Sequence, residues 1–137
     1  MCALAAWGVV LSASAMNRWE ALSMLETGDD DSAVGRCGEI SRYQIRAELW
    51  PGGNPQNARA ALSVARNIMQ TRVARFQETH GRSPTNFEFY VLWNAPAEID
   101  HPVPCVAERA RRYANLVERE THQAQAAASF RKTTNAS

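Results

Sequence analysis

The sequence predicts a mainly α-helical protein built as one small domain. Apolar residues recur at the spacing of one helix face in several segments, and capping residues or glycines stand at the ends of those segments. No stretch keeps the two-residue alternation of a half-buried strand. A chain of 137 residues is the length of a single domain and can bury one core.

Residues 2–15 form an apolar run at the amino terminus. The run ends in Ala13-Ser14-Ala15, which has the small-x-small form of a signal peptidase site. Because no lysine or arginine precedes it, an apolar first helix is the alternative. The run is shorter than the about 18 apolar residues that span a bilayer. We therefore expect residues 1–15 to be a signal peptide of an exported protein, periplasmic or extracellular, without a stable membrane span.

The first helix of the domain is predicted to begin after Asn17, because Glu20 at the third helical position completes a capping-box pattern. Gly28 is expected to end it. Glu26 shares one face of this helix with large apolar side chains, Trp19, Leu22 and Leu25. Desolvation at such a position favours the neutral form of a carboxyl group, which is the form that a general acid needs.

A polar loop follows and carries three consecutive aspartates, Asp29, Asp30 and Asp31. A solvated acidic turn is the simplest interpretation. Their spacing does not fit an EF-hand, which places ligands at alternate positions and a glycine at the sixth. A carboxylate that positions a water molecule is the other interpretation. Residues 41–50 are then predicted to form a short helix, which Pro51-Gly52-Gly53 ends.

The longest helical pattern runs from about Pro55 to His80, and Gly81 is expected to end it. Its apolar stripe is expected to be core. Ser83 as N-cap and Pro84 at the first helical position predict the start of the next helix.

That next helix contains the aromatic-rich run 87–93 and should be buried, ending at Asn94-Ala95-Pro96. Tyr90 and Trp93 in this run, with Trp50, could offer flat faces to sugar rings. A final helix is predicted from about Cys105 to His122. Residues 123–137 are rich in Ala, Gln, Ser and Thr, and we expect a disordered tail there, so the domain spans residues 16–122.

Composition argues against several classes of function. The net charge of +1 predicts no binding to nucleic acid or to an anionic membrane. The three histidines stand in no zinc-binding pattern, so neither a metal nor a cofactor is expected.

Two blocks of the sequence carry a family resemblance. Glu26-Thr27-Gly28, Ala33-Val34-Gly35 and the run from Gly38 to Ile45 resemble, without a gap, the motif E-S-x-x-N-P-x-A-V-S-x-x-G-A-x-G-L-M-Q-L. This is the core motif of the soluble lytic transglycosylase (SLT) domain, within the lysozyme-like superfamily. The run from Tyr90 to Pro96 resembles the family's later A-Y-N-A-G segment, in the right order. The resemblance covers about Asn17 to Tyr113.

The resemblance implies a lysozyme-like helical fold with a cleft and a glycosidase activity. Family members cut the β-1,4 bond between N-acetylmuramic acid (MurNAc) and N-acetylglucosamine (GlcNAc) in peptidoglycan. One glutamate serves as acid and then as base, the muramoyl 6-hydroxyl attacks, and the product is a 1,6-anhydro sugar. Carried over by position, Glu26 is the general acid/base. The expected substrate-binding residues are Ser41, Tyr43, Gln44, Trp93 and Asn94. No protein partner is indicated.

Some positions depart from the motif. Trp93 stands where the family has tyrosine, so a hydroxyl that could reach the substrate or Glu26 is missing, and Tyr43 is a possible replacement. Gly35 replaces a serine, and Glu39 replaces a small alanine. These changes leave alternatives open. A hydrolysing lysozyme would use Glu26 with a second carboxylate, Glu39 or one of Asp29, Asp30 and Asp31.

Other interpretations are a glycan-binding module without chemistry, and a structural helical protein in which Glu26 is simply paired with an arginine. The cysteines give one further expectation. Cleavage after Ala15 would remove Cys2 and leave Cys37 and Cys105. The SLT-like fold would bring their regions to the same cleft, so we expect a disulfide between them.

Overall fold

The computed structural model describes residues 16–134, so the expected signal peptide lies outside the described residues. The described elements are α1 (Arg18–Thr27), a short 3₁₀ helix η1 (Ala47–Leu49), α2 (Ala58–His80), α3 (Asn86–Asn94), a second 3₁₀ helix η2 (Pro96–Glu98) and α4 (Pro104–Thr134). Within residues 16–134 the only β-structure is two isolated bridges. The predicted mainly α-helical class is confirmed. No helix in this range combines the length and apolar character needed to cross a membrane.

Helix α1 has the predicted ends. The Asn17 side chain accepts hydrogen bonds from the backbone N–H groups of Trp19 and Glu20, and the Glu20 carboxylate accepts the Asn17 N–H at 2.9 Å. Gly28 closes the helix in the left-handed conformation at φ 67°. The capping box orients α1 so that Ala21, Leu22 and Ser23 are buried.

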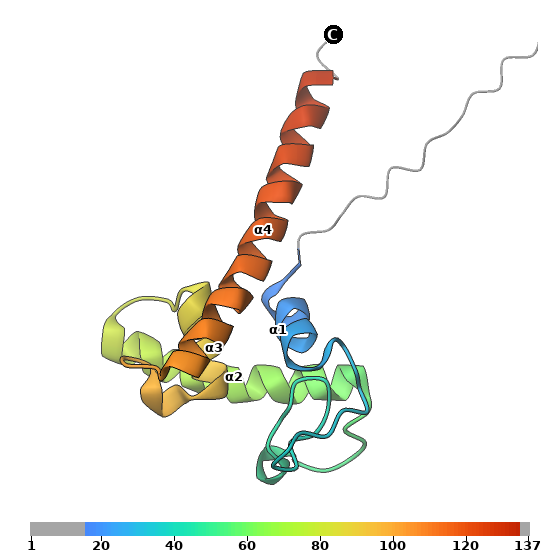
Figure 1. Cartoon of the computed structure of the whole chain (residues 1–137), viewed down its shortest axis with the longest axis vertical. Coiled ribbons are helices and arrows are strands. Elements are labelled where there is room, and N and C mark those ends of the chain that lie inside the picture. The colour runs from blue at the N-terminus through green and yellow to red at the C-terminus, as the bar shows by residue number, and fades with distance from the viewer. Residues whose placement is uncertain (1–15, 135–137) are drawn as a thin grey trace, which may run out of the picture.

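Helix α3 is the centre of the fold. Its residues Phe89, Tyr90, Val91, Leu92 and Trp93 are all buried, as expected for a helix that is apolar on every side. It packs against α4 on one side and α2 on another, and Figure 1 shows α4 crossing in front of it. Its N-cap is Thr85 and not the predicted Ser83. Thr85 is the better cap because its hydroxyl accepts the Glu88 N–H, while the Glu88 carboxylate accepts the Thr85 N–H and also pairs with Arg82.

The predicted short helix over residues 41–50 is wrong. A tight turn from Ser41 to Gln44 occupies its first part, closed by reciprocal 2.8 Å backbone bonds between Ile40 and Ile45. Ser41 and Gln44 have φ values of 69° and 51°, which no right-handed helix accommodates. Only Ala47–Leu49 forms a single turn of 3₁₀ helix. The residues from Val34 to Ile45, which the two bridges tie together, are called the hairpin segment below.

Helices α2 and α4 differ from the prediction at their ends. Helix α2 begins after Asn57, later than expected, and stops at Gly81 as predicted. Its stripe of Ala61, Ala65, Met69 and Phe76 is buried core. Helix α4 continues to Thr134, so residues 123–134, expected in a disordered tail, are helical. Figure 1 shows this part of α4 extending beyond the other helices.

Candidate active site

A cleft of about 360 Å³ opens between the end of α1, the hairpin segment, the end of α3 and the first turns of α4. It brings together five of the side chains predicted from the sequence, which are Glu26, Glu39, Gln44, Trp93 and Asn94. They come from three separate parts of the chain, so only the packing of α1 and α3 under the hairpin segment unites them.

Glu26 lies in the last turn of α1, and its side chain is only 5% exposed. The Tyr90 hydroxyl donates to Oε1 at 2.7 Å, and the Arg109 guanidinium donates to Oε2 at 3.2 Å. Each carboxylate oxygen therefore has one protein donor, while the side chain still lines the cleft. A nearly buried carboxyl beside an open cleft is suited to exchanging a proton with a bound molecule.

Tyr90 supplies the hydroxyl that the sequence pattern lacked at Trp93. It stands one helical turn earlier in α3 and is fully buried. Burial first, and then the negative charge of Glu26, raise the pKa of Tyr90 far above its usual value. Tyr90 therefore remains a neutral O–H donor to Glu26 at any physiological pH. The sequence pattern indicates this residue only as a flat face for sugar rings.

The suggested alternative, Tyr43, does not reach the cleft. Its ring is 4% exposed and packs edge-on against Trp19 and Trp93. Burial raises its pKa. Ser41 is also buried, at 2% exposure, and its hydroxyl accepts the Tyr43 N–H at 3.3 Å. Neither residue is among those that line the cleft, and both pack inside the hairpin segment, so their predicted contact with substrate stays a prediction.

Arg109 was not anticipated. It is separated from Glu26 by 83 residues and comes from α4, whose arginines the sequence does not distinguish from one another. Its side chain is 43% exposed. The simple interpretation of Glu26 as an arginine-paired carboxylate is therefore realised in the structure, together with the cleft.

The far wall of the cleft is fixed by Arg72 of α2. Its Nη1 donates to the carbonyl oxygens of Leu92 and Trp93, at 2.8 and 2.7 Å. Because these carbonyls end α3, the contacts hold Trp93 and the exposed Asn94 at the rim. Burial, and then the positive charge of Arg46, lower the pKa of Arg72.

Gly35 and Glu39 are fitted to one another in the hairpin segment. A Cβ at Gly35 would collide with the Glu39 carboxylate and the Gln44 side-chain oxygen. The Glu39 carboxylate also accepts the Cys37 N–H at 3.0 Å, while the Gln44 amide donates to the Ser41 carbonyl at 3.3 Å. The missing side chain at Gly35 thus makes room for a second carboxylate in the cleft.

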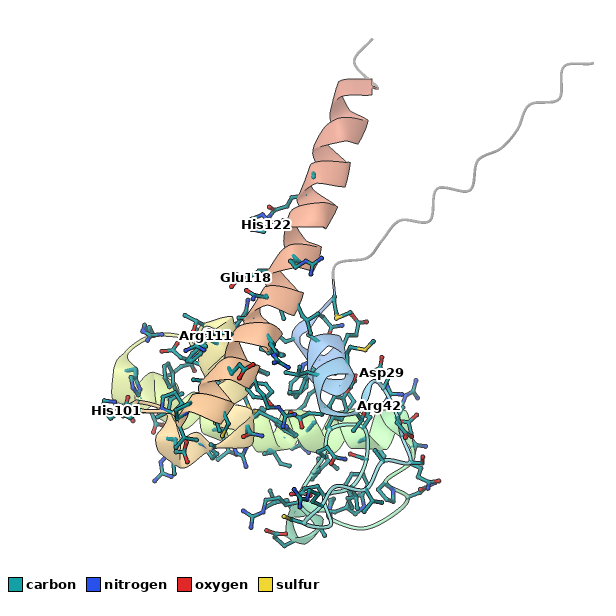
Figure 2. The ribbon with its side chains drawn as sticks, viewed as in Figure 1. Asp29, Arg42, His101, Arg111, Glu118 and His122 are labelled. Carbon is teal, nitrogen blue, oxygen red and sulfur yellow. The ribbon has the colours of Figure 1, made fainter. Side chains whose placement is uncertain are left out.

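The three aspartates lie elsewhere. Asp31 binds the Arg42 guanidinium through two contacts of 2.6 and 2.9 Å, and this pairing lowers its pKa. Asp29 accepts the Ser23 hydroxyl, and its Oδ1 lies 3.7 Å from Nη1 of Arg42. Figure 2 labels Asp29 and Arg42 beside each other at the end of α1. Asp30 bonds Ser32, which lowers its pKa. None of the three is among the described residues that line the cleft, so the structure favours the interpretation as a polar turn.

Cys37 and Cys105 carry free, exposed thiols, so the expected disulfide is absent. Cys37 belongs to the hairpin segment, and Cys105 to the first turn of α4, and the packing that forms the cleft does not join them. Within residues 16–134, no three His, Cys, Asp or Glu side chains are grouped closely enough to hold a metal ion.

Comparison with known proteins returned nothing: no protein-family model, no curated protein and no solved structure matches this chain.

Proposed function

We propose that this protein cleaves the glycan strand of peptidoglycan at the MurNAc-β-1,4-GlcNAc bond, in the manner of a lytic transglycosylase, with Glu26 as general acid/base. One observation carries the proposal. The nearly buried Glu26 carboxyl meets an open cleft whose other walls bear Gln44, Trp93 and Asn94. Gln44 and Asn94 are the side-chain types that the SLT-like motifs carry at these positions, and Trp93 stands where those motifs carry a tyrosine.

The hairpin segment supports the lysozyme-like interpretation. Ser41 stands where the resembled motif has glycine, and its φ of 69° is a conformation that glycine adopts freely. Gln44, at the position of the motif glutamine, has a φ of 51° and lines the cleft. Backbone held in this region tends to occur at functional sites.

The reaction needs only one carboxyl group. Protonated Glu26 gives its proton to the glycosidic oxygen as the bond to C1 breaks. The resulting carboxylate then takes the proton of the muramoyl 6-hydroxyl as that oxygen bonds to C1, which closes the 1,6-anhydro ring and restores the acid. Tyr90 keeps one carboxyl oxygen in place through both steps.

The ion pair between Arg109 and Glu26 must break before Glu26 can act as an acid. Its 3.2 Å contact is longer than the about 2.7–2.9 Å of a strong charge-assisted bond. Its side chain is 43% exposed and can turn toward a ligand. We propose that substrate in the cleft takes over this guanidinium, so that Glu26 is left with its Tyr90 contact and its buried surroundings.

A hydrolysing lysozyme is the second candidate function, because Glu39 lines the same cleft as Glu26. A carboxylate there could position a water molecule for attack at C1. Asp29, Asp30 and Asp31 are weaker candidates, because they bond Ser23, Ser32 and Arg42 outside the cleft. A glycan-binding module is the third candidate, favoured by the Arg109–Glu26 ion pair. The proposal places the protein outside the cytoplasmic membrane, in agreement with the signal-like residues 1–15.

Mass spectrometry of purified peptidoglycan after incubation with the protein separates these candidates. The variant Glu26→Gln removes the proton donor and keeps the shape. Glu118→Gln, on the exposed face of α4 away from the cleft, is the matched control (Figure 2). We expect anhydromuropeptides from the wild type and from Glu118→Gln, and at least about a hundredfold less from Glu26→Gln.

Reducing-end products that vanish in Glu26→Gln would instead establish hydrolysis, and Glu39→Gln should then also be inactive. Binding of glycan without any soluble product from the wild type would establish a binding module. If the wild type neither binds glycan nor releases soluble product, the proposal is overturned.

A further inference from the structure

The charged side chains that line the cleft are unequal in number. Four are arginines, and only two are glutamates. This local excess of positive charge is larger than the net charge of the whole chain, which is +1. The field in the cleft therefore favours a negatively charged ligand.

Two of the arginines are engaged in building the site. Arg109 pairs with Glu26, and Arg72 donates to the carbonyls at the end of α3. Arg46 differs, because its contact with Glu48 is at the surface, with the two side chains 71% and 59% exposed. Such a pair contributes little in water and is easily exchanged. Arg36 is exposed and has no ion pair or hydrogen bond with any residue of the described range 16–134.

The positive charges also act on one another. The charge of Arg46 adds to burial in lowering the pKa of Arg72, so these two cations repel each other across the cleft. The two carboxylates do not remove this excess, since the four lining arginines outnumber them and Glu26 is already paired with Arg109. An anionic group of the ligand would relieve the repulsion.

We infer that Arg36 and Arg46 bind a carboxylate of the ligand, so that the cleft selects the acidic glycan strand of peptidoglycan over an uncharged polymer of GlcNAc. This inference rests on the proposed function and names what decides its substrate. A planar guanidinium matches a carboxylate through two parallel hydrogen bonds. In peptidoglycan that carboxylate belongs either to the peptide stem or, where the stem has been removed, to the lactyl group of MurNAc.

Binding can be measured with the wild-type full chain, because the disaccharide GlcNAc-β-1,4-MurNAc lacks the bond that the proposed reaction cuts. Four ligands separate the sources of charge. They are the disaccharide with its peptide stem, the same with the stem carboxylates amidated, the disaccharide without a stem, and uncharged di-N-acetylchitobiose. The dissociation constant of each is measured by titration calorimetry at low and high salt.

We expect the stem-bearing or the stemless disaccharide to bind about tenfold more tightly than chitobiose, with the difference shrinking as salt is raised. Tight binding of the stem-bearing form and weak binding of its amidated form assign the carboxylate to the stem. Tight binding of the stemless form alone assigns the carboxylate to the lactyl group. An amidated form that binds as tightly as the acidic ligands overturns the inference, because it carries no carboxylate.

The double variant Arg36→Gln/Arg46→Gln should bind all four ligands with equal affinity. Arg111→Gln is the matched control, because this exposed arginine of α4 lies outside the cleft (Figure 2). A wild type that binds chitobiose as tightly as the acidic ligands, or binds none of the four, overturns the inference. So does a control variant that loses as much preference as the double variant. Strand cleavage without charge preference refutes only this inference, whereas charge-selective binding without cleavage refutes only the proposed chemistry.

Discussion

Replacing Tyr90 by phenylalanine tests how firmly the buried hydroxyl holds Glu26. The change removes one O–H group, which donates to Glu26 at 2.7 Å, and keeps the ring and its contact with Tyr113 at a centroid distance of 5.5 Å. Because the Tyr90 side chain is fully buried, its phenylalanine replacement leaves Oε1 of Glu26 without a protein donor. A hydrogen bond to a charged group contributes about 1.5–3 kcal/mol. We expect Tyr90→Phe to lower the free energy of unfolding by that amount, and the melting temperature by about 5–12 °C.

Urea denaturation followed by circular dichroism measures the loss. Tyr113→Phe is the matched control, because Tyr113 is equally buried but donates to a neutral carbonyl, that of Arg18, at 3.0 Å. Its loss should be only about 0.5–1.5 kcal/mol. In a Glu26→Gln background, Tyr90→Phe should also cost less, since the acceptor is then uncharged. Equal losses for the two tyrosines, or an unchanged loss in the Gln background, would refute the reasoning.

Three further predictions concern the supports of the site. The Arg82 guanidinium, with the Thr85 cap, lowers the pKa of Glu88 to about 2, so the folded state should lose about 1 kcal/mol as pH falls from about 4.5 to about 2. Acid titration monitored by circular dichroism should show this loss in the wild type and not in Glu88→Gln. Gly35→Ala should destabilise the protein by about 1–3 kcal/mol through its clash with the Glu39 carboxylate. Thermal melting should show partial recovery in Gly35→Ala/Glu39→Ala, because the clash with the Gln44 side-chain oxygen remains, and a double variant no more stable than the single one would contradict the packing argument. Asn17→Ala should cost about 1 kcal/mol by removing the cap of α1, and a melting temperature equal to that of the wild type would show that this cap is dispensable.

The site joins local supports to distant ones. The cap at Asn17 fixes where α1 begins, and Gly28 ends the helix two residues after Glu26. Arg72 then secures the end of α3, where Trp93 and Asn94 face the same cleft. A change in any of these supports should therefore disturb the position of cleft side chains that it does not touch.

Several sequence predictions that depend on residues within one or two helical turns are confirmed by the structure. The capping box of α1, the glycine stops at Gly28 and Gly81 and the buried stripe of α2 all depend on neighbours a few residues apart. Glu26 was singled out in the same way, because Trp19, Leu22 and Leu25 share its helix face. Such local geometry is the same wherever the segment lies, so the pattern alone is informative.

The turn at residues 41–44 could not be recognised. Its residues include Ser41 and Gln44, which occupy the left-handed region although neither is glycine. Contacts with distant parts of the chain stabilise it, including the bond from the Thr27 hydroxyl to the Arg42 carbonyl at 3.0 Å. Local propensity favoured a helix, and these tertiary contacts outweighed it.

By itself, the sequence predicted the helical class and the ends of α1. It also named ten candidate site residues, of which the structure brings Glu26, Glu39, Gln44, Trp93 and Asn94 to one cleft. Only the tertiary structure decided what surrounds Glu26, because Tyr90 and Arg109 are 64 and 83 residues away from it. It also decided that Asp31 pairs with Arg42 and that Cys37 and Cys105 stay unpaired. The packing of the helices determines which charged or polar side chains come into contact. That packing depends on the burial of the whole core and not on any one segment.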